Sequence, residues 1–327
     1  MKKILRRVLR AGVLTLALLG IGLAALKWYL DATYFNGYDP TAPLRVEVVE
    51  DRELPAFRWT KFYYAGHRGA RVPAVMALPK GGPGPFPCVV FLHGIGNDKE
   101  LMRRLEMDVP FVEAGFAFVS FDQLTRGERK LPTRSGLARA EAFRVRAAHT
   151  VNDTRRLMDY LATRPDIATN RIYLVGASYG AITGTTAAAF DPRIRAAVLI
   201  YGGGNLSELL SASAIGDLNR RQRLLYRLLA WYFCSVFDPV RYAGRIAPRP
   251  VLFQNGRGDT VIAPSAARAL QEAARAPKRI LWYDGDHLDR TGESDGATLR
   301  RVLADALQFL QEVDTAVRNN NPLLPAS

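Results

Sequence analysis

Cysteine and histidine, two residue types that often bind transition metals, are scarce in this chain. Its 327 residues include two cysteines and four histidines. Cys88 and Cys234 belong to no Cys-x-x-Cys motif or Cys/His cluster, which argues against a zinc site and against a thiol redox centre. We expect both to be small buried hydrophobic residues, and a disulfide between them stays open if the compartment is oxidising.

Acidic residues are absent from the first 30 positions of the chain. That segment carries six positive charges, from Lys2, Lys3, Arg6, Arg7, Arg10 and Lys27. The rest of the net charge of +14 is spread along the sequence, mostly as arginine, without a basic tail or an aromatic RNA-binding motif. We therefore expect no nucleic-acid partner, although a basic surface favours acidic substrates or anionic lipid headgroups.

The N-terminus combines a charged stretch with an apolar run. Residues 1–10 hold five Lys or Arg, and residues 11–26 are uncharged and mainly apolar. If Lys27 snorkels and Trp28-Tyr29 lie at the headgroups, the run reaches the roughly 17–25 residues that a membrane-spanning helix needs. We predict a signal anchor over residues 1–30, with the rest of the chain outside the cytoplasm, periplasmic or extracellular. A cleaved signal peptide, which would give a secreted protein, fits the same pattern.

Residues 31–327 read as one domain without repeats or low-complexity tracts. The chain is 48% apolar and 23% charged, which is enough for a full core. Strand-like apolar runs are expected at 44–50, 56–64, 72–78, 87–93, 116–121, 171–175, 196–201, 250–254 and 279–283. Helical stretches are expected up to residue 113 and at 140–163, 179–190, 265–274 and 296–313.

This alternation predicts an α/β fold, with a mainly parallel sheet flanked by helices. In such sheets, ligands bind beyond the carboxyl ends of the strands. Residues 202–246 interrupt the alternation after a strand, and we expect them to form a helical cap insertion. The centre of that insertion is broadly apolar and follows several arginines, so its surface must be buried against the domain, a ligand or a membrane.

The strongest chemical signal is Gly176-Ala177-Ser178-Tyr179-Gly180. It fits G-x-S-x-G and lies between an expected strand and an expected helix of small residues. The two glycines let the strand and the helix approach closely around a sharp turn that presents the serine hydroxyl at the sheet edge. A serine in an ordinary strand-to-helix turn would be an N-cap, but this context favours Ser178 as a nucleophile.

A serine hydroxyl needs a base that removes its proton as it attacks. His67 is expected in an exposed hairpin turn, His149 within a helix, and His93 at the end of a strand that precedes the serine. His287 follows the last expected strand, in a loop at the carboxyl edge of the sheet. We therefore predict His287 as the base.

The base in turn needs a carboxylate that fixes its tautomer and stabilises the imidazolium. Asp259 follows a buried strand and lies between the serine and the histidine in the chain, which is the order known for such sites. Asp286 is adjacent to His287, and a sequence neighbour rarely points back at the ring. Glu208, after the preceding strand, is the remaining rival.

Negative charge that develops on a substrate carbonyl oxygen needs two backbone N–H groups as partners. We predict that one comes from Tyr179, which follows the nucleophile. The other is expected from the loop His93-Gly94-Ile95-Gly96, where we choose Ile95, with His93 supporting the loop.

Together, the H-G-x-G loop, the G-x-S-x-G elbow, Asp259 and His287 resemble the α/β-hydrolase superfamily over about residues 70–315. Within that region, the segments 122–128 and 151–153 resemble the branch of dienelactone hydrolases and acetyl xylan esterases. The resemblance implies acyl transfer by a Ser-His-Asp triad on a small-molecule ester, without metal or cofactor. Dienelactone hydrolases use a cysteine nucleophile, so Ser178 points to the esterase side of the branch.

Two other functions stay open. A serine peptidase of the prolyl-oligopeptidase type shares this catalytic domain, but that family normally carries a propeller domain, for which there is no room before Pro87. A catalytically silent, membrane-anchored binding protein would keep the same fold. Hydrolysis of simple esters without cleavage of aminoacyl-anilides, and labelling by a fluorophosphonate, would separate these possibilities.

Overall fold

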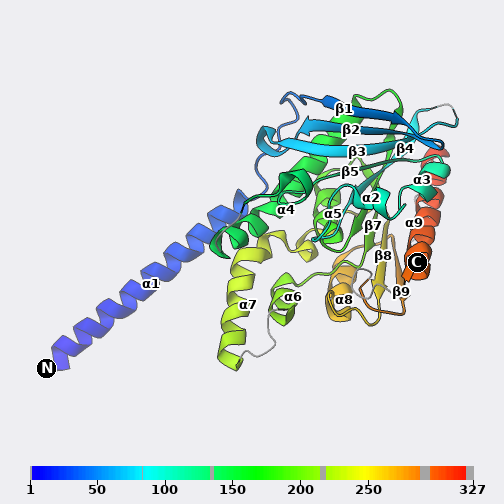
Figure 1. Ribbon diagram of the computed structural model, residues 1–327. Coiled ribbons are helices and arrows are strands. Elements are labelled where there is room, and N and C mark those ends of the chain that lie inside the picture. The colour runs from blue at the N-terminus through cyan, green and yellow to red at the C-terminus, as the bar shows by residue number, and fades with distance from the viewer. Residues whose placement is uncertain (1, 83, 133–135, 214–218, 288–294, 322–327) are drawn as a thin grey trace. The chain divides into compact units, whose positions relative to one another are not determined.

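A computed structural model describes residues 2–82, 84–132, 136–213, 219–287 and 295–321 of the chain (Figure 1). The chain separates into two compact units, Met1–Asn36 and Gly37–Ser327.

The N-terminal unit is dominated by one long helix, α1 (Lys2–Ala32). Its segment Arg6–Ala32 has a mean hydropathy of 2.0 over its most apolar window, none of which is buried. At 1.5 Å per residue, the helix is longer than the roughly 30 Å hydrocarbon core of a bilayer. By length and composition, α1 is therefore a candidate membrane segment.

The second unit is built on a nine-stranded sheet with the strand order β1-β2-β3-β5-β4-β6-β7-β8-β9. The strands from β4 to β9 run parallel, whereas β1, β2 and β3 form an antiparallel edge that joins at β5. The strands are β1 (Glu47–Glu53), β2 (Phe57–Ala65), β3 (Arg71–Pro79), β4 (Phe86–Leu92), β5 (Ala117–Phe121), β6 (Ile167–Ala177), β7 (Ile194–Ile200), β8 (Val251–Gly256) and β9 (Lys278–Tyr283).

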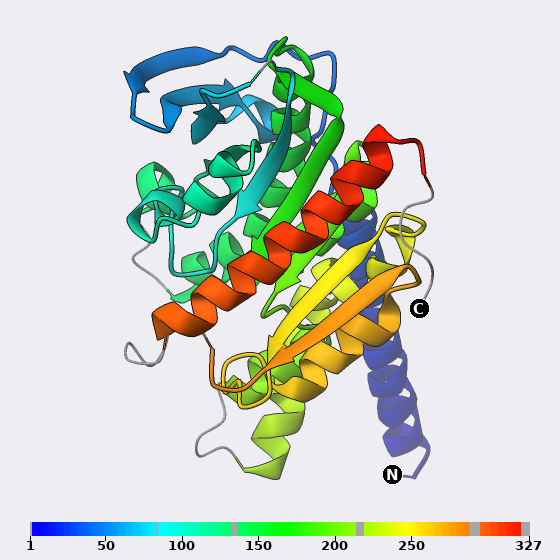
Figure 2. The ribbon, with the colours of Figure 1, turned by 90° about the vertical axis from the view of Figure 1, so that its right-hand side faces the viewer.

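Helices cover both faces of this sheet. Figure 2 shows α9 lying across one face, with α4, α5 and α8 behind the strands. The helices are α2 (Leu101–Arg104), α3 (Val109–Glu113), α4 (Gly136–Ala162), α5 (Tyr179–Phe190), α6 (Leu206–Ser213), α7 (Arg220–Cys234), α8 (Pro264–Ala273) and α9 (Asp295–Arg318). The predicted α/β class, with a mainly parallel sheet between helices, is confirmed.

The core between the sheet and α9 explains why the central strands are almost uninterrupted apolar runs. Strands covered on both faces need apolar side chains in both directions. The core includes Phe91, Phe118, Tyr173, Val198, Phe309 and Leu310, all nearly or completely buried. Cys88 in β4 and Cys234 at the end of α7 are also buried, as expected, and no disulfide joins them.

The strand register aligns the carboxyl ends of the central strands. Leu92 of β4 pairs with Gly176 of β6, and Gly176 pairs with Leu199 of β7. The segments that follow these strands therefore begin at the same edge of the sheet. This alignment brings residues that are far apart in the sequence to one place.

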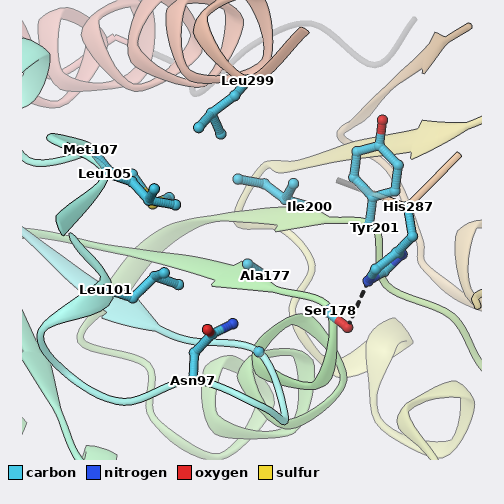
Figure 3. Close-up of a pocket in the computed structure, with 11 residues that line it drawn as sticks. Asn97, Leu101, Leu105, Met107, Ala177, Ser178, Ile200, Tyr201, His287 and Leu299 are labelled. Carbon is cyan, nitrogen blue, oxygen red and sulfur yellow. Dashed lines mark hydrogen bonds between the residues drawn. The ribbon is translucent and has the colours of Figure 1, made fainter. Parts of the chain in front are cut away.

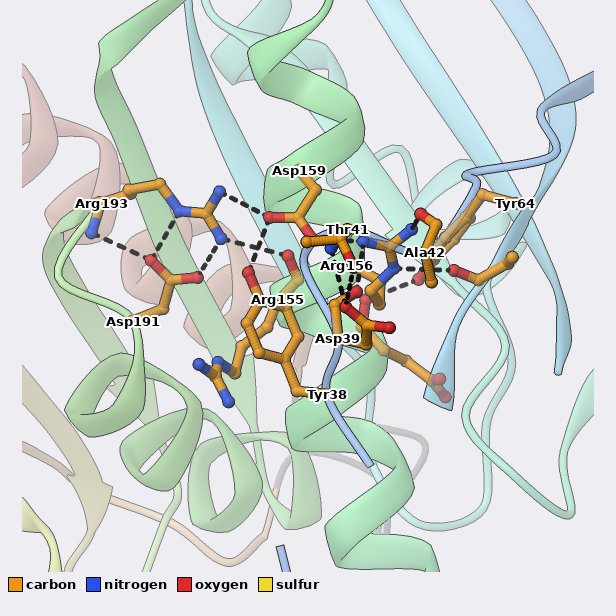
Figure 4. Close-up of polar contacts among 12 residues, drawn as sticks. Tyr38, Asp39, Thr41, Ala42, Tyr64, Arg155, Arg156, Asp159, Asp191 and Arg193 are labelled. Carbon is orange, nitrogen blue, oxygen red and sulfur yellow. Dashed lines mark hydrogen bonds and ion pairs between the residues drawn. The ribbon is translucent and has the colours of Figure 1, made fainter. Parts of the chain in front are cut away.

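The beginning of the second unit is fixed to α4 by a polar network (Figure 4). The Arg156 guanidinium donates to the backbone oxygens of Asp39 and Ala42, at 2.9 and 2.6 Å, and to Asp159 Oδ2 at 2.7 Å. The Tyr38 hydroxyl donates to the other oxygen of Asp159, at 2.9 Å. Arg156 is 2% exposed, so its charge is matched by a carboxylate and by carbonyl oxygens rather than by water.

Two local expectations were wrong. The turn between β2 and β3 is a short 3₁₀ turn, His67–Gly69, and His67 is buried rather than exposed. Its backbone N–H donates to Asp153 Oδ1 at 2.6 Å, and its ring lies against the ring of His149. The helical stretch expected before residue 113 is two short helices, α2 and α3.

Candidate active site

Ser178 occupies a sharp turn between β6 and α5. Its backbone angles are φ 55° and ψ −117°, an uncommon conformation for a residue with a side chain. The turn is held by the Ser178 N–H, which donates to Ile200 O at 2.8 Å, and by the Ser178 carbonyl, which accepts from Ala181 N at 2.9 Å. The strand, turn and helix expected around Ser178 are thus present.

The two glycines of the motif are required by packing. A Cβ on Gly176 would lie 2.3 Å from Gly180 O, and a Cβ on Gly180 would lie 1.9 Å from Leu92 O. Both contacts are with backbone atoms, which cannot rotate away. β6, α5 and β4 can approach this closely only where the side chain is absent.

The hydroxyl of Ser178 is the first member of a chain of hydrogen bonds. His287 Nε2 lies 3.0 Å from Ser178 Oγ (Figure 3), and His287 Nδ1 lies 2.9 Å from Asp259 Oδ2. His287 and Asp259 are both buried, at 5% and 4% exposure. The second carboxylate oxygen, Oδ1 of Asp259, accepts from Val261 N at 2.8 Å and from Ile262 N at 2.7 Å. These bonds fix the direction in which the carboxylate points.

The structure places the two rival carboxylates differently. Asp286 Oδ1 accepts from the backbone N–H groups of Thr260 and His287, both at 2.7 Å, and so ties two loops together. Glu208 lies in α6, where it accepts a hydrogen bond from Arg227 at 2.7 Å and is largely exposed. The ring of His287 faces Asp259 instead.

The loop after β4 is supported by His93. Its Nδ1 lies 2.8 Å from Gly94 O, and Gln123 donates from its side chain to His93 O at 2.7 Å. His93 is completely buried, and this burial lowers the pKa of its imidazole to about 4. The ring is therefore neutral at physiological pH and serves to hold the loop.

The two residues predicted to supply N–H donors lie beside Ser178. Tyr179 is the first residue of α5, so its N–H has no acceptor within the helix. Ile95 lines the same cavity as Ser178 and Tyr179. The loop approaches the serine closely, since a Cβ on Gly94 would lie 3.6 Å from Ser178 Cβ.

Sequence reasoning missed Arg146 of α4, which connects the two candidate donors. Its guanidinium lies 4.5 Å from the ring centroid of Tyr179 and donates to Ile95 O at 3.3 Å. A further contact, of 3.5 Å, joins it to Gln123 Oε1. The available signal was the spacing of Ala142, Arg146 and Thr150, which places an arginine on the buried face of α4.

Two cavities meet at Ser178. One has a volume of about 70 Å³ (Figure 3) and is lined by Gly94, Asn97, Leu101, Leu105, Met107, Ala177, Ser178, Ile200, Tyr201, His287 and Leu299. The other has a volume of about 130 Å³ and is lined by Ile95, Phe143, Ser178, Tyr179, Ile182, Leu206, Leu209, Phe237, Val261 and Ile262. Both are mainly apolar, so the hydroxyl lies between two apolar compartments.

Within the part of the chain that the structure describes, no three His, Cys, Asp or Glu side chains come together in a group that could hold a metal ion.

The mainly parallel sheet between helices, with a serine, an imidazole and a carboxylate hydrogen-bonded in a chain at its carboxyl edge, indicates one class of protein. Comparison with known proteins indicates the same class. Residues 89–319 match the sequence profile of the Alpha/beta hydrolase family, and the chain belongs to that family.

Among its relatives, it is 26% identical over 233 residues to "Putative hydrolase YtaP" of Bacillus subtilis (strain 168), covering 64% of this chain and 73% of the relative. It is 23% identical over 212 residues to "Esterase YjfP" of Escherichia coli (strain K12), covering 62% of this chain and 81% of the relative.

Solved structures show the same fold. Acetyl xylan esterase 1 from Thermoanaerobacterium sp. JW/SL YS485 superposes with a TM-score of 0.67 at 20% identity, over 87% of this chain and 93% of the other. A putative dienelactone hydrolase from Klebsiella pneumoniae superposes with a TM-score of 0.56 at 18% identity, over 81% of this chain and 98% of the other. These likenesses show that the fold is shared, and the family match confirms the expected resemblance to the α/β-hydrolase superfamily.

Proposed function

We propose that this protein is a serine hydrolase that cleaves carboxylic esters, with Ser178 as nucleophile, His287 as base and Asp259 as the supporting carboxylate. The observation that carries the proposal is the continuous chain of hydrogen bonds from Ser178 Oγ through the imidazole to a buried carboxylate. Family membership and relatives named as hydrolases and esterases support the same class of reaction.

The mechanism follows from this arrangement. Ser178 Oγ attacks the carbonyl carbon of the ester while its proton passes to His287 Nε2. Asp259 holds Nδ1–H and stabilises the imidazolium that forms. The tetrahedral oxyanion binds the backbone N–H groups of Tyr179 and Ile95, which need no reorganisation because the elbow and the supported loop already fix them.

Collapse of the tetrahedral intermediate breaks the bond to the alcohol, which leaves with the proton from His287. The acyl group then remains bound to Ser178. A water molecule attacks this acyl-enzyme, transfers its proton to His287, and the carboxylic acid departs as the serine takes the proton back. The two apolar cavities at Ser178 are suited to the acyl and alcohol parts of the substrate.

The decisive experiment compares Ser178→Ala with Ser265→Ala in the full chain, purified in detergent. Ser265 is exposed in α8 and is a matched control. Hydrolysis of p-nitrophenyl butyrate should fall about 10⁴-fold or more in Ser178→Ala and stay unchanged in Ser265→Ala. A fluorophosphonate should label the wild type and the control but not Ser178→Ala.

The same measurements separate the alternatives. Cleavage of aminoacyl-anilides at rates above ester hydrolysis would favour a peptidase. Folded wild-type protein that neither hydrolyses esters nor reacts with the fluorophosphonate would be a silent member of the family and would contradict the proposal.

We further propose that residues 1–30 attach the hydrolase domain, residues 31–327, to a membrane, with the domain outside the cytoplasm. The length and apolar character of α1 support this proposal. Protease accessibility of the domain in sealed vesicles tests the orientation, and N-terminal sequencing of the mature protein distinguishes an anchor from a cleaved signal peptide.

A further inference from the structure

A third cavity, distinct from the two that meet at Ser178, is basic. Its volume is about 370 Å³, and it is lined by Ile95, Thr125, Arg126, Lys130, Leu131, Ala142, Phe143 and Arg146. Three of these residues are cationic and none is acidic. They come from the segment after β5 and from α4, so two elements direct positive charge into one cavity.

The most buried of the three cations is Arg146. It is 1% exposed, and the acceptors of its guanidinium hydrogen bonds, Ile95 O and Gln123 Oε1, are neutral. The Nε atoms of Arg146 and Arg126 are buried without a hydrogen-bond partner among the described residues. Buried charges in proteins are normally matched by a carboxylate. An arginine in this position is therefore prepared for an anion from outside the chain.

Two acidic residues on the elements that line this cavity, Asp153 and Glu128, form ion pairs with other cations. Asp153 binds Arg129 at 2.7 Å, and Glu128 binds Lys99, also at 2.7 Å. Desolvation, together with the neighbouring charges of Arg126 and Arg129, lowers the pKa of Arg146 to about 10. Among the described residues, no carboxylate forms an ion pair with Arg126, Lys130 or Arg146.

The basic cavity adjoins the site. Ile95 and Phe143 line both the basic cavity and the apolar cavity that contains Ser178 and Tyr179. A substrate whose ester lies at Ser178 can extend through the apolar cavity, past these two side chains, and place its far end among the cations.

We propose that the basic cavity binds an anionic group of the substrate, so that the protein prefers esters carrying a carboxylate or a phosphate away from the scissile bond. This inference rests on the proposed function. Arginine suits both groups because its planar fork donates two parallel hydrogen bonds to a pair of oxygens. Lys130 adds a point charge at the cavity wall.

Matched substrates test the preference. The full chain in detergent is assayed with p-nitrophenyl monoesters of dicarboxylic acids and with their methyl-capped analogues of equal length. A second arm uses butyrate esters of phosphorylated and unphosphorylated alcohols, which distinguishes a carboxylate from a phosphate. We expect kcat/KM at least roughly tenfold higher for the anionic member of a pair, as for one charge-assisted hydrogen bond, and a smaller ratio at high salt.

Variants show which residues cause the preference for anionic esters. Arg126→Gln and Lys130→Gln, singly and together, should remove it while leaving hydrolysis of the methyl-capped ester unchanged, and Arg275→Gln, an exposed arginine after α8, should remove nothing. Equal kcat/KM for both members of each pair, or a preference that survives the double variant, would overturn the proposal.

Binding gives a readout that does not depend on activity. Suberate and glycerol phosphate should raise the melting temperature of Ser178→Ala, and the addition of Arg126→Gln and Lys130→Gln should abolish the shift. If the anions stabilise the protein but no ester is cleaved, the proposed function fails and the anion site stands. If neutral esters are cleaved but no anion binds, the proposed function stands and the proposed anion site fails.

A second observation concerns the surface of α7. Its large apolar side chains are 47% to 60% exposed; they are Leu224, Leu225, Tyr226, Leu228, Leu229, Trp231 and Phe233. None of them lines either cavity at Ser178. Arg220, Arg223 and Arg227 follow one another at spacings of three and four, which places them on one side of the helix, whereas Arg221, in the first turn, lies on the side of Leu225 and Leu228.

We infer that α7 lies on an anionic lipid bilayer. Apolar patches of this extent on a protein surface mark contact with another molecule or a membrane. A helix with an apolar side and an arginine-rich side is the form that lies in a membrane interface. The same chain carries a candidate membrane helix, α1, which would hold the domain close to a bilayer.

Quenching by brominated lipids tests this contact in the full chain, reconstituted into nanodiscs of phosphatidylglycerol and phosphatidylcholine. The quenched fraction of tryptophan fluorescence should fall in Trp231→Phe but not in the matched variant Trp282→Phe, which changes β9. Equal quenching in both variants would overturn the inference. A dimer in detergent that Leu228→Asp dissociates would assign the surface to a second copy of the chain.

Discussion

Replacement of Asp259 by asparagine gives the sharpest test of the proposed triad, because the surrounding backbone dictates how the new amide must point. Oδ1 of Asp259 accepts from Val261 N and Ile262 N, at 2.8 and 2.7 Å, while Oδ2 faces His287 Nδ1 at 2.9 Å. An asparagine that keeps the first two bonds must direct its NH₂ group at Nδ1. The imidazole then has to accept at Nδ1 and carry its proton on Nε2, where it cannot remove the proton of Ser178.

The opposite orientation of the amide in Asp259→Asn is energetically unfavourable. It would direct the NH₂ group at two backbone N–H donors, and an unsatisfied buried donor costs about 1–3 kcal/mol. The inactive tautomer should therefore dominate. We expect kcat to fall by up to about 10⁴-fold, which corresponds to about 5 kcal/mol of transition-state stabilisation, while the free energy of unfolding changes little.

The assay is hydrolysis of p-nitrophenyl butyrate, with urea unfolding as the control for stability. Asp286→Asn is the matched variant, since Asp286 is the next residue to the histidine but binds Thr260 N. It should retain activity within roughly tenfold, the effect of losing one hydrogen bond. Near-wild-type activity of Asp259→Asn, together with a large loss in Glu208→Gln, would refute the reasoning and assign the carboxylate to α6.

Further predictions follow from burial and packing. Burial lowers the pKa of both His93 and His67 to about 4, so the unfolded chain binds protons at these residues first as the pH falls below about 6.5. The free energy of unfolding should therefore be fully retained above pH 6.5 and decrease between pH 6.5 and 4, by up to about 3 kcal/mol per histidine. A free energy of unfolding in urea that does not change over this pH range would contradict the prediction. Gly180→Ala should destabilise the fold by several kcal/mol, at or above the ~1–3 kcal/mol typical of overpacking, because the new methyl meets Leu92 O; a thermal melt near that of the wild type would show that the elbow can relax. Leu209→Trp should narrow the larger cavity at Ser178 and lower kcat/KM for octanoate relative to acetate, whereas Trp231→Ala, outside both cavities, should leave the chain-length profile unchanged.

Features that depend on local pattern could be predicted from the sequence. The alternation of strands and helices, and the position of Ser178 between β6 and α5, follow from short-range periodicity and from two glycines. The prediction that Asp259 and His287 lie near Ser178 used their order in the chain and their positions after strands, since parallel strands bring their carboxyl ends to one edge.

Features that depend on contacts between distant segments could not be predicted. His67 lies in a turn that the sequence indicates is exposed, but Asp153, 86 residues further on, accepts its N–H and draws it into the interior. The spacing of Ala142, Arg146 and Thr150 places Arg146 on the buried face of α4, but no local pattern shows which residues it contacts there. Its importance arises because α4 packs where Ile95 and Tyr179 come together.

The packing of Gly176 and Gly180 affects how a G-x-S-x-G signature should be interpreted in any uncharacterised chain. Their missing side chains make room for backbone atoms of β4 and α5, and that requirement persists whether or not the serine between them ever reacts. A descendant that lost its chemistry but kept its architecture would retain both glycines. The glycines are therefore evidence for the fold. Evidence for catalysis has to come from groups that the fold does not require, which are the hydroxyl, the imidazole and the carboxylate.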